Sequence, residues 1–363
     1  MNEYSRFIDP CRRSVPVSKQ LVDADGSCVF GTFDSEFESM DLLRAKKPTY
    51  APQFLNRFKL TLWEAAEINL KEGVLLAVVC DMGFFGKTLN IFFDRRTKKV
   101  TTWDTNLSSR NTHIAPNLLR GSVTEAETKT SCVHYENHFE QGKCHLSGHH
   151  TGSDKSSSDT LSYDFHLSRI SKPSVVSIPF GPNRPLYSQK DFFHVEGSLT
   201  LNGETLSSDE NTTAVVDDHR GYYPRRMHYD WVTTMGTNAS NGKKQFLALN
   251  LTRNQSMDQD KYNENLIWKE GTTSLLPPVT FRRHPQSKDF KGESIWLIND
   301  EHDMVRIRFT VQGISPMILH AGVISIDYHV SFGELGGYVR DEDGTMYILD
   351  GMMGMGEDKT TLF

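Results

Sequence analysis

Apolar and polar residues alternate along much of this chain, and the alternation predicts strands. It is clearest over residues 305–311 and 324–332; in the second stretch the apolar residues on one face are Ile324, Ile326, Tyr328, Val330 and Phe332. Because successive side chains of a strand point to opposite faces, each stretch is expected to be a half-buried strand. The other segments predicted as strands are residues 57–70, 73–81, 88–93, 129–139, 143–149, 161–168, 195–201, 244–251 and 345–349.

Turn-forming residues separate these segments. Gln141-Gly142, Asn202-Gly203 and Asp343-Gly344 supply the positive φ that tight hairpins require, and the charged residues 94–99 are a further expected hairpin tip. Helical periodicity is scarce, and residues 31–44 and 54–70 are the candidates for short helices. Many short strands between turns predict a mostly-β fold of antiparallel barrels or sandwiches with few short helices.

A proline-rich break indicates where the chain divides. The segment Pro179-Phe-Gly-Pro-Asn-Arg-Pro185 interrupts regular structure, so a boundary is expected near residues 185–200. A length of 363 residues is enough for two domains. We therefore predict an N-terminal β domain over residues 1–195 and a C-terminal β domain over residues 196–363.

Composition narrows the class of protein. Forty-six acidic and forty basic residues give a net charge of −6 without a basic run, so no nucleic-acid partner is expected. The most apolar run, residues 74–80, is too short to cross a bilayer, and no transmembrane segment is predicted. Five widely spread cysteines and an N-terminus without an apolar signal stretch favour free thiols in the cytoplasm.

The densest group of reactive side chains lies between Asp217 and Trp231. These fifteen residues include three carboxylates, two histidines, three arginines, three tyrosines and a tryptophan. Gly221 and Pro224 interrupt regular structure, so the first part is expected to be a shaped loop that leads into a strand.

The order of short motifs along the chain resembles one family. The motifs are Trp63, Asp81-Met-Gly-Phe-Phe-Gly86, Phe192-Phe-His-Val-Glu-Gly197, Asp218-His-Arg-Gly221, Trp231, Leu249-Asn-Leu251, Glu264-Asn-Leu-Ile-Trp268, Phe332-Gly333 and Gly354-Met-Gly-Glu357. In this order they resemble domain-of-unknown-function family 2804, which is itself similar to lipocalin-like proteins of the carotenoid hydratase (hydroxyneurosporene synthase) type. Tyr229 departs from the pattern, because a second tryptophan is expected there.

The resemblance implies two lipocalin-like β domains with a ligand pocket inside or between them. It also implies a hydratase, isomerase or cyclase that acts on a largely apolar molecule. Such an enzyme needs a carboxyl group that keeps its proton, and burial against aromatic rings raises a carboxyl pKa enough to do so. The candidate catalytic residues are Asp218, Asp230, Glu264 and, as a base, His228. The candidate substrate-binding residues are Arg220, Tyr222, Tyr223, Arg225, Tyr229, Trp231, Trp268 and Glu357.

Structural roles compete with these assignments. Asp218 next to Arg220 is also the pattern of a salt bridge, and a histidine among aromatic residues is often a packing residue. Arg220 and Arg225 are alternatively a clamp for a ligand carboxylate or phosphate. The same pocket in a non-catalytic lipid or isoprenoid carrier is a second hypothesis. A carbohydrate-active enzyme that uses Asp218 with Glu264 or Glu357 is a third.

A second group of residues has metal-ligand chemistry. It consists of Cys132, His134, His138, His145 and His149, which alternate along the two arms of the hairpin expected at Gln141-Gly142. Zinc accepts such ligands, but the spacing matches no standard zinc motif, and polar residues that line a barrel would alternate in the same way. We expect no cofactor, a small apolar or amphipathic molecule as partner, and a monomer or homodimer.

Overall fold

The computed structural model describes residues 12–152, 158–240, 242–285, 293–321 and 324–362. The chain divides into two compact units, here called the barrel unit and the half-barrel unit. The barrel unit is Pro16–Tyr223, and the half-barrel unit is Pro224–Phe363 with the segment that ends at Val15. The expected boundary between residues 195 and 196 falls inside strand β13 (Pro185–Leu201), whereas the two units divide at Tyr223 and Pro224, within the predicted site segment.

The barrel unit is a near-closed antiparallel barrel with the strand order β6-β5-β4-β3-β15-β13-β11-β10-β9-β8-β7. Its strands are β2 (Gly31–Phe33), β3 (Thr61–Asn69), β4 (Gly73–Asp81), β5 (Phe85–Asp94), β6 (Lys99–Ser108), β7 (Thr112–His113), β8 (Ser122–Glu127), β9 (Ser131–His138), β10 (Lys143–His150), β11 (Leu161–Arg169), β12 (Ser174–Pro179), β13, β14 (Glu204–Ser207) and β15 (Thr213–Gly221). Its short 3-10 helices are η1 (Leu42–Arg44), η2 (Gln53–Phe58), η3 (Ser109–Asn111) and η4 (Phe139–Gln141).

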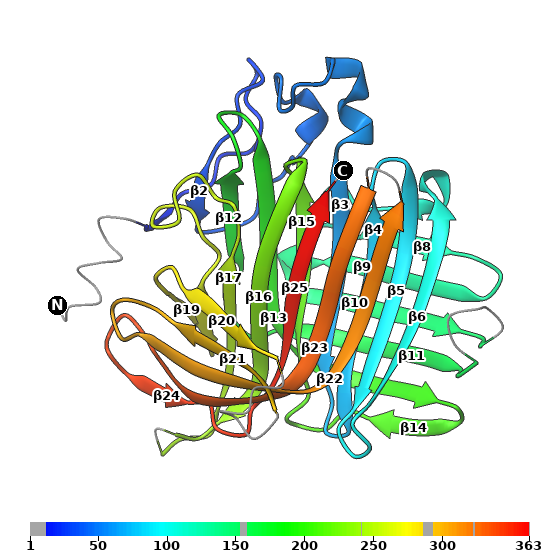
Figure 1. The fold of residues 1–363 in the computed structure, drawn as a ribbon, viewed down its shortest axis with the longest axis vertical. Helices are drawn as coiled ribbons and strands as arrows, with labels where there is room; N and C mark the ends of the chain where they lie inside the picture. The colour runs from blue at the N-terminus through cyan, green and yellow to red at the C-terminus, as the bar shows by residue number, and fades with distance from the viewer. Residues whose placement is uncertain (1–11, 153–157, 241, 286–292, 322–323, 363) are drawn as a thin grey trace. The chain divides into compact units, whose positions relative to one another are not determined.

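Side chains from opposite walls of the barrel unit meet in its interior. In Figure 1, strands β9–β11 run across the direction of β3–β6. The hydroxyl of Tyr135 on β9 donates to the carbonyl of Ala77 on β4 at 2.7 Å, and that of Tyr163 on β11 donates to Asn90 on β5 at 2.9 Å. These buried tyrosines lie in one apolar cluster with residues such as Leu75 and Phe165. The interior is therefore a packed core over most of its length.

The half-barrel unit is a second antiparallel sheet, with the order β19-β18-β17-β16-β25-β23-β22-β21-β20. The strands of this sheet are β16 (Arg226–Asn238), β17 (Gln245–Arg253), β18 (Leu266–Lys269), β19 (Thr272–Leu275), β20 (Thr280–His284), β21 (Ser294–Asn299), β22 (Val305–Ala321), β23 (Ile324–Arg340), β24 (Met346–Ile348) and β25 (Met353–Leu362). The two-residue strand β1 (Ser14–Val15) does not belong to this sheet.

Two glycines of β25 belong to the motif Gly354-Met-Gly-Glu357, and their surroundings explain why glycine occurs there. A Cβ atom on Gly354 would lie 2.1 Å from the Leu335 side chain, and one on Gly356 would lie 2.8 Å from the Trp296 ring. Leu335 and Trp296 both belong to the buried apolar cluster of this unit. Glycine at these two positions therefore makes room for the core to pack directly against the backbone of β25.

The alternation of apolar and polar residues located most strands correctly. Strand β4 matches its predicted range, and β22 and β23 contain the two clearest predicted stretches. The hairpin expected at Gln141-Gly142 joins β9 to β10, with Gly142 at a φ of 66°. Residues 57–70 were expected as a strand and residues 54–70 as a candidate for a short helix. Residues 61–69 form β3, so the strand is confirmed and the helix is wrong beyond residue 58. The loop expected from Asp217 is also wrong, since β15 continues to Gly221.

Two smaller expectations can be compared with the structure. The cysteines that it describes, Cys28, Cys80, Cys132 and Cys144, are free thiols as expected, while Cys11 lies outside the described residues. Within the described ranges, no helix has the length and apolar character needed to cross a bilayer.

We expect Tyr135→Phe to lower the free energy of unfolding by about 1–2 kcal/mol, because a buried carbonyl loses its hydroxyl donor. Tyr135→Ala should cost about 3–5 kcal/mol, since it also opens a cavity. Guanidinium denaturation followed by tryptophan fluorescence measures both values. Tyr50→Phe is the control, because Tyr50 is fully exposed. Equal stability of the Tyr135→Phe variant and the wild type would show that the cross-barrel bond contributes nothing.

Candidate functional site

A pocket of about 460 Å³ lies at one end of the barrel unit. Its apolar wall includes Met40, Leu42, Leu60, Leu62 and Ile114, and its polar residues include Arg57, Asp81, His113 and Arg220. The segment with η1 and η2 forms one side, and the ends of β3, β4 and β15 form the other. The volume falls in the range that suits a small organic ligand.

Strand register places the inward-facing residues of four neighbouring strands in rows below this pocket. The row that meets the pocket runs across β13, β15, β3 and β4 as Tyr187, Arg220, Leu62 and Asp81. The next row inward is Gln189, Asp218, Glu64 and Val79. The following row is Asp191, Val216, Ala66 and Ala77. Polar groups are therefore concentrated at the pocket end, and the interior becomes apolar with depth.

Arg220, which lines the pocket, forms a buried ion pair with Asp218. The Asp218 carboxylate accepts from Arg220 Nε at 3.0 and 3.1 Å, and Nη2 lies 2.9 Å from Oδ2. The guanidinium also donates to the carbonyls of Ala115 at 2.6 Å and Pro116 at 3.2 Å. Burial raises the pKa of Asp218, and the charge of Arg220 opposes that increase. The salt bridge that the sequence offered as an alternative role for Asp218 is present.

Glu64 is a second buried carboxyl group, directly opposite Asp218 on the neighbouring strand. Desolvation raises the pKa of Glu64 to about 8, and the nearby Asp218 contributes in the same direction. Asn137 donates to Glu64 Oε2 at 3.2 Å. Glu64 therefore keeps its proton at neutral pH, which is the property that the sequence reasoning assigned to Asp218, Asp230 or Glu264.

Sequence reasoning missed Glu64 although a signal for it exists. Along β3, Glu64 stands between Leu62 and Ala66 on a face that is otherwise apolar. A carboxylate at such a position must be paired or neutral, because an isolated buried charge is too costly. Arg57 and Asp81 were also missed as a pair; they line the pocket and form an ion pair of 2.6 Å.

The other predicted catalytic residues lie in the half-barrel unit. His228 Nε2 is 3.2 Å from Asp230, and Arg283 Nε is 3.4 Å from the same carboxylate. Arg283 also forms a close ion pair with Asp358, which stands opposite Asp230 in the register. One arginine thus lies against both carboxylates.

Glu357 and Tyr229, both predicted to bind substrate, contact each other. The Glu357 carboxylate accepts hydrogen bonds of 2.6 Å from the hydroxyls of Tyr229 and Tyr328. Lys359 lies over both phenol rings, with its nitrogen 4.8 Å from the centre of Tyr328. Tyr229, at the position that departs from the expected tryptophan, therefore uses its hydroxyl group to hold a carboxylate.

Several motif residues meet at Asn250 of β17. Trp231 donates to Asn250 Oδ1 at 2.5 Å, and Asn250 donates to the main-chain carbonyl of Glu264 at 2.9 Å. Glu264 and Trp268 are buried. Through these contacts, Trp231 and Glu264 take part in the packing of the half-barrel unit.

The remaining predicted substrate-binding residues lie close in sequence to the point where the two units divide, at Tyr223 and Pro224. Tyr222 is buried and donates to the carbonyl of Leu42, and Tyr223 stacks on Trp63. Arg225 is exposed between β15 and β16.

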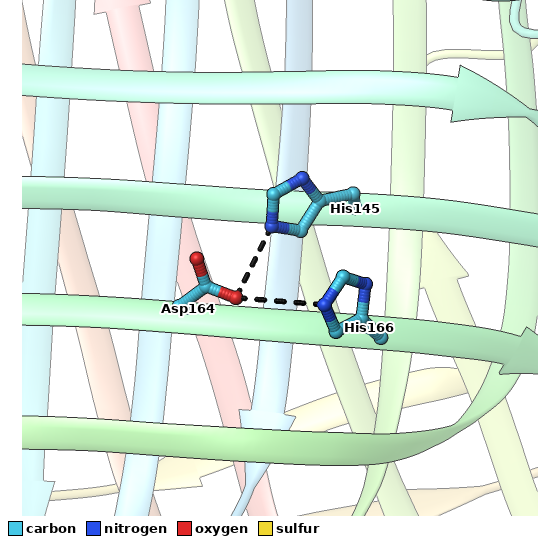
Figure 2. Close-up of side chains that lie close together, drawn as sticks. All are labelled: His145, Asp164 and His166. Atoms are coloured by element: carbon cyan, nitrogen blue, oxygen red, sulfur yellow. Dashed lines mark hydrogen bonds and ion pairs between the residues drawn. The ribbon is translucent and has the colours of Figure 1, made fainter.

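The histidine-rich hairpin has the expected alternation but a different set of converging ligands. Cys132, His134, His138, His145 and His149 share one face of β9 and β10. Among the described residues, His145 joins a cluster of potential ligand atoms with Asp164 and His166 of β11, without the other four. Figure 2 shows both imidazole rings directed at the Asp164 carboxylate. The sequence could not indicate this set, because the pairing of β10 with β11 was unknown.

Together, the fold and the pocket define a two-unit antiparallel β protein with a buried acid directly behind the lining of a pocket of about 460 Å³. Residues 12–363 match the family described as Domain of unknown function (DUF2804), and the chain belongs to this family. The family resemblance drawn from the order of the motifs is therefore confirmed.

Two solved structures align with most of the chain. Kievitone hydratase from Nectria haematococca aligns over 83% of this chain and 88% of its own, with 13% identity and a TM-score of 0.48. CghA with Sch210972 aligns over 96% of this chain and 98% of its own, with 8% identity and a TM-score of 0.48. Among curated proteins, none matches the sequence.

We expect Glu64→Gln to change how stability depends on pH. Folding raises the Glu64 pKa from an ordinary value near 4.3 to about 8, so the folded state binds this proton more tightly. The stabilisation that the folded state gains from this tighter proton binding is fully present below about pH 4.3. It is lost as the pH rises towards about 8. Relative to the glutamine variant, the wild type should lose about 1.4 kcal/mol of stability per pH unit between about pH 5 and pH 7.5.

Chemical denaturation of both proteins across this pH range measures the difference. Glu127→Gln is the control, because Glu127 is an exposed residue of the same unit and its substitution should leave the pH dependence unchanged. Parallel pH profiles of the wild type and Glu64→Gln would contradict a protonated Glu64.

Proposed function

We propose that the barrel unit is an enzyme that transfers a proton to a small, largely apolar molecule bound in the end pocket. The observation that carries this proposal is the buried Glu64, whose pKa is raised to about 8, beside the Arg220–Asp218 pair directly behind the pocket lining. The reaction class is hydration, isomerisation or cyclisation, in each of which a carboxylic acid can protonate an alkene or a carbonyl group.

The lining of the pocket supports a ligand with an apolar body and one polar group. Met40, Leu42 and Ile114 offer apolar contacts, while Arg57 offers a cation on the same wall. Arg57 Nη2 is used by Asp81 and Ser109, but Nη1 is inaccessible to water and has no hydrogen-bond partner among the described residues. The positive charge of Arg57, which lines the pocket, would attract the polar or anionic group of such a ligand.

The position of Glu64 supports its role as proton donor. It lies one row inside Leu62 and Arg220, which both line the pocket. When Glu64 gives up its proton, the new carboxylate is close enough to Arg220 for the positive charge to stabilise it, since that charge already lowers the Glu64 pKa. A raised carboxyl pKa near neutrality is also what efficient general acid catalysis requires.

A non-catalytic carrier is the second candidate, and one observation favours it. Glu64 and Asp218 lie behind the wall of the pocket, and Arg220 already donates to Asp218 and to the carbonyls of Ala115 and Pro116. In a carrier these groups would only hold the end of the barrel together. Binding and turnover must therefore be measured separately.

Binding at the pocket can be tested with 1-anilinonaphthalene-8-sulfonate, which combines an apolar body with an anion. Leu62→Trp fills the pocket and should abolish saturable binding, and Arg57→Gln should weaken it about tenfold, as expected for loss of a hydrogen bond to a charged group. Fluorescence titration gives the affinities. Ile318→Trp adds the same ring at an exposed position of the half-barrel unit and should have no effect. Unchanged binding by Leu62→Trp would exclude this pocket as the site.

Catalysis can be tested on the compound that native mass spectrometry finds bound to the purified wild type. Glu64→Gln should lower kcat by at least about 100-fold while the affinity for this compound stays similar, because a general acid contributes roughly 10²–10⁴ to the rate. The Glu127→Gln variant should retain full activity. Turnover that survives Glu64→Gln would favour another acid, and binding without turnover by the wild type would favour the carrier.

A further inference from the structure

We propose that His145, Asp164 and His166 form a binding site for one divalent transition-metal ion, with Zn²⁺ as the reference ion, on the outer face of the barrel unit. The site uses residues outside the end pocket and does not depend on the proposed enzymatic function.

Strand register brings the three side chains together. His145 on β10 stands directly opposite His166 on β11, and Asp164 precedes His166 by two residues on the same strand. All three therefore point to the same face. It is the outer face, since the alternate residues Leu146 and Phe165 belong to the interior cluster. Two hydrogen-bonded strands fix the three Cα positions before any ligand arrives.

The donor atoms have a separation that suits tetrahedral coordination. Nε2 of His145 is 3.1 Å and Nε2 of His166 is 3.7 Å from the same oxygen, Oδ1 of Asp164. The three potential ligand atoms lie within 4.8 Å of one another. Metal–donor bonds of about 2.1 Å at tetrahedral angles place neighbouring donors about 3.4 Å apart. The two distances to Asp164 Oδ1 bracket this value, and side-chain rotations would complete the geometry (Figure 2).

The surroundings of the cluster favour a cation. The cross-strand row that contains the two histidines continues to Glu136 on β9 and to Glu196 on β13. Both glutamates are at least partly exposed and lie on the same outer face. With Asp164, three carboxylates therefore lie in or next to the histidine pair. Two histidines and one carboxylate suit Zn²⁺, and three protein ligands leave a fourth position for water.

The rings of the two histidines lie next to each other. They are stacked, with centroids 4.5 Å apart and an interplanar angle of 13°. Because the lone pair of an imidazole lies in the plane of its ring, the two rings rotate out of this parallel arrangement when both nitrogens bind one ion.

The test uses the full chain, without a histidine tag and stripped of metal by a chelator. Calorimetric titration with Zn²⁺ should show one equivalent bound, and titration with Co²⁺ should give the visible absorption of a tetrahedral site. His145→Gln, His166→Gln and Asp164→Asn should each weaken binding by at least about tenfold, because even partners outside the coordination shell contribute that much.

A matched control uses the same face of the barrel. His134 lies on β9 with its Nδ1 3.2 Å from Glu125, so His134→Gln removes one histidine that also has a carboxylate partner. This substitution should leave Zn²⁺ affinity unchanged. Thermal unfolding of the metal-free variants should match that of the wild type, because the three ligand positions are on the surface.

The proposal is overturned if the wild type shows no saturable one-to-one binding, or if His134→Gln weakens binding as much as the three ligand substitutions. An anomalous difference map of a Zn²⁺-soaked crystal gives a check that needs no variant. A peak between His145, Asp164 and His166 supports the site, and a peak only elsewhere contradicts it.

Discussion

The end of the barrel unit depends on one buried arginine that lies beside two carboxyl groups. Arg220 forms the ion pair with Asp218 and donates to two carbonyls that follow β7, so it ties β15 to the segment that leads to β8. A single guanidinium cannot also neutralise Glu64, and a second buried negative charge would cost several kcal/mol. Glu64 therefore keeps its proton. The same arrangement contributes Arg220 to the pocket lining and holds a weak acid directly behind it.

The apolar rows deeper in the barrel offset the free energy that it costs to bury these polar groups. Ile68, Leu75, Phe193 and Ala214 form a fully buried row across the four strands, two rows inward of Glu64. Burial of this apolar core stabilises the folded state, whereas the buried polar groups at the pocket end lower its stability. Active sites commonly retain groups that lower stability, because their chemistry needs a desolvated acid or an unsatisfied donor. Glu64 and Arg57 Nη1 fit this description at the end of the barrel where the pocket lies.

Much of the fold could be predicted from the sequence, and less of the site. Alternation identifies strands such as β4 and β23 because each has one buried face, but it does not say which strands are neighbours. Glu64 and Asp218 are far apart in sequence, so their pairing depends on β3 lying next to β15. The segment from Asp217 to Trp231 was singled out because its reactive residues are dense. Yet the division at Tyr223 and Pro224 assigns Asp218 and Asp230 to different units.

The same alternation assigns different chemistry to the two faces of the barrel strands. On β10 and β11, Leu146 and Phe165 fill the interior, while His145 and His166 are free to meet Asp164 outside. The interior can hold a carboxyl group whose pKa is shifted by burial, whereas the outer face holds imidazoles and carboxylates that water and ions can reach. Substitutions on the outer face leave the packed core intact. Substitution of Glu64 removes the buried acid, and substitution of Asp218 breaks the ion pair with Arg220. The two sites can therefore be altered independently.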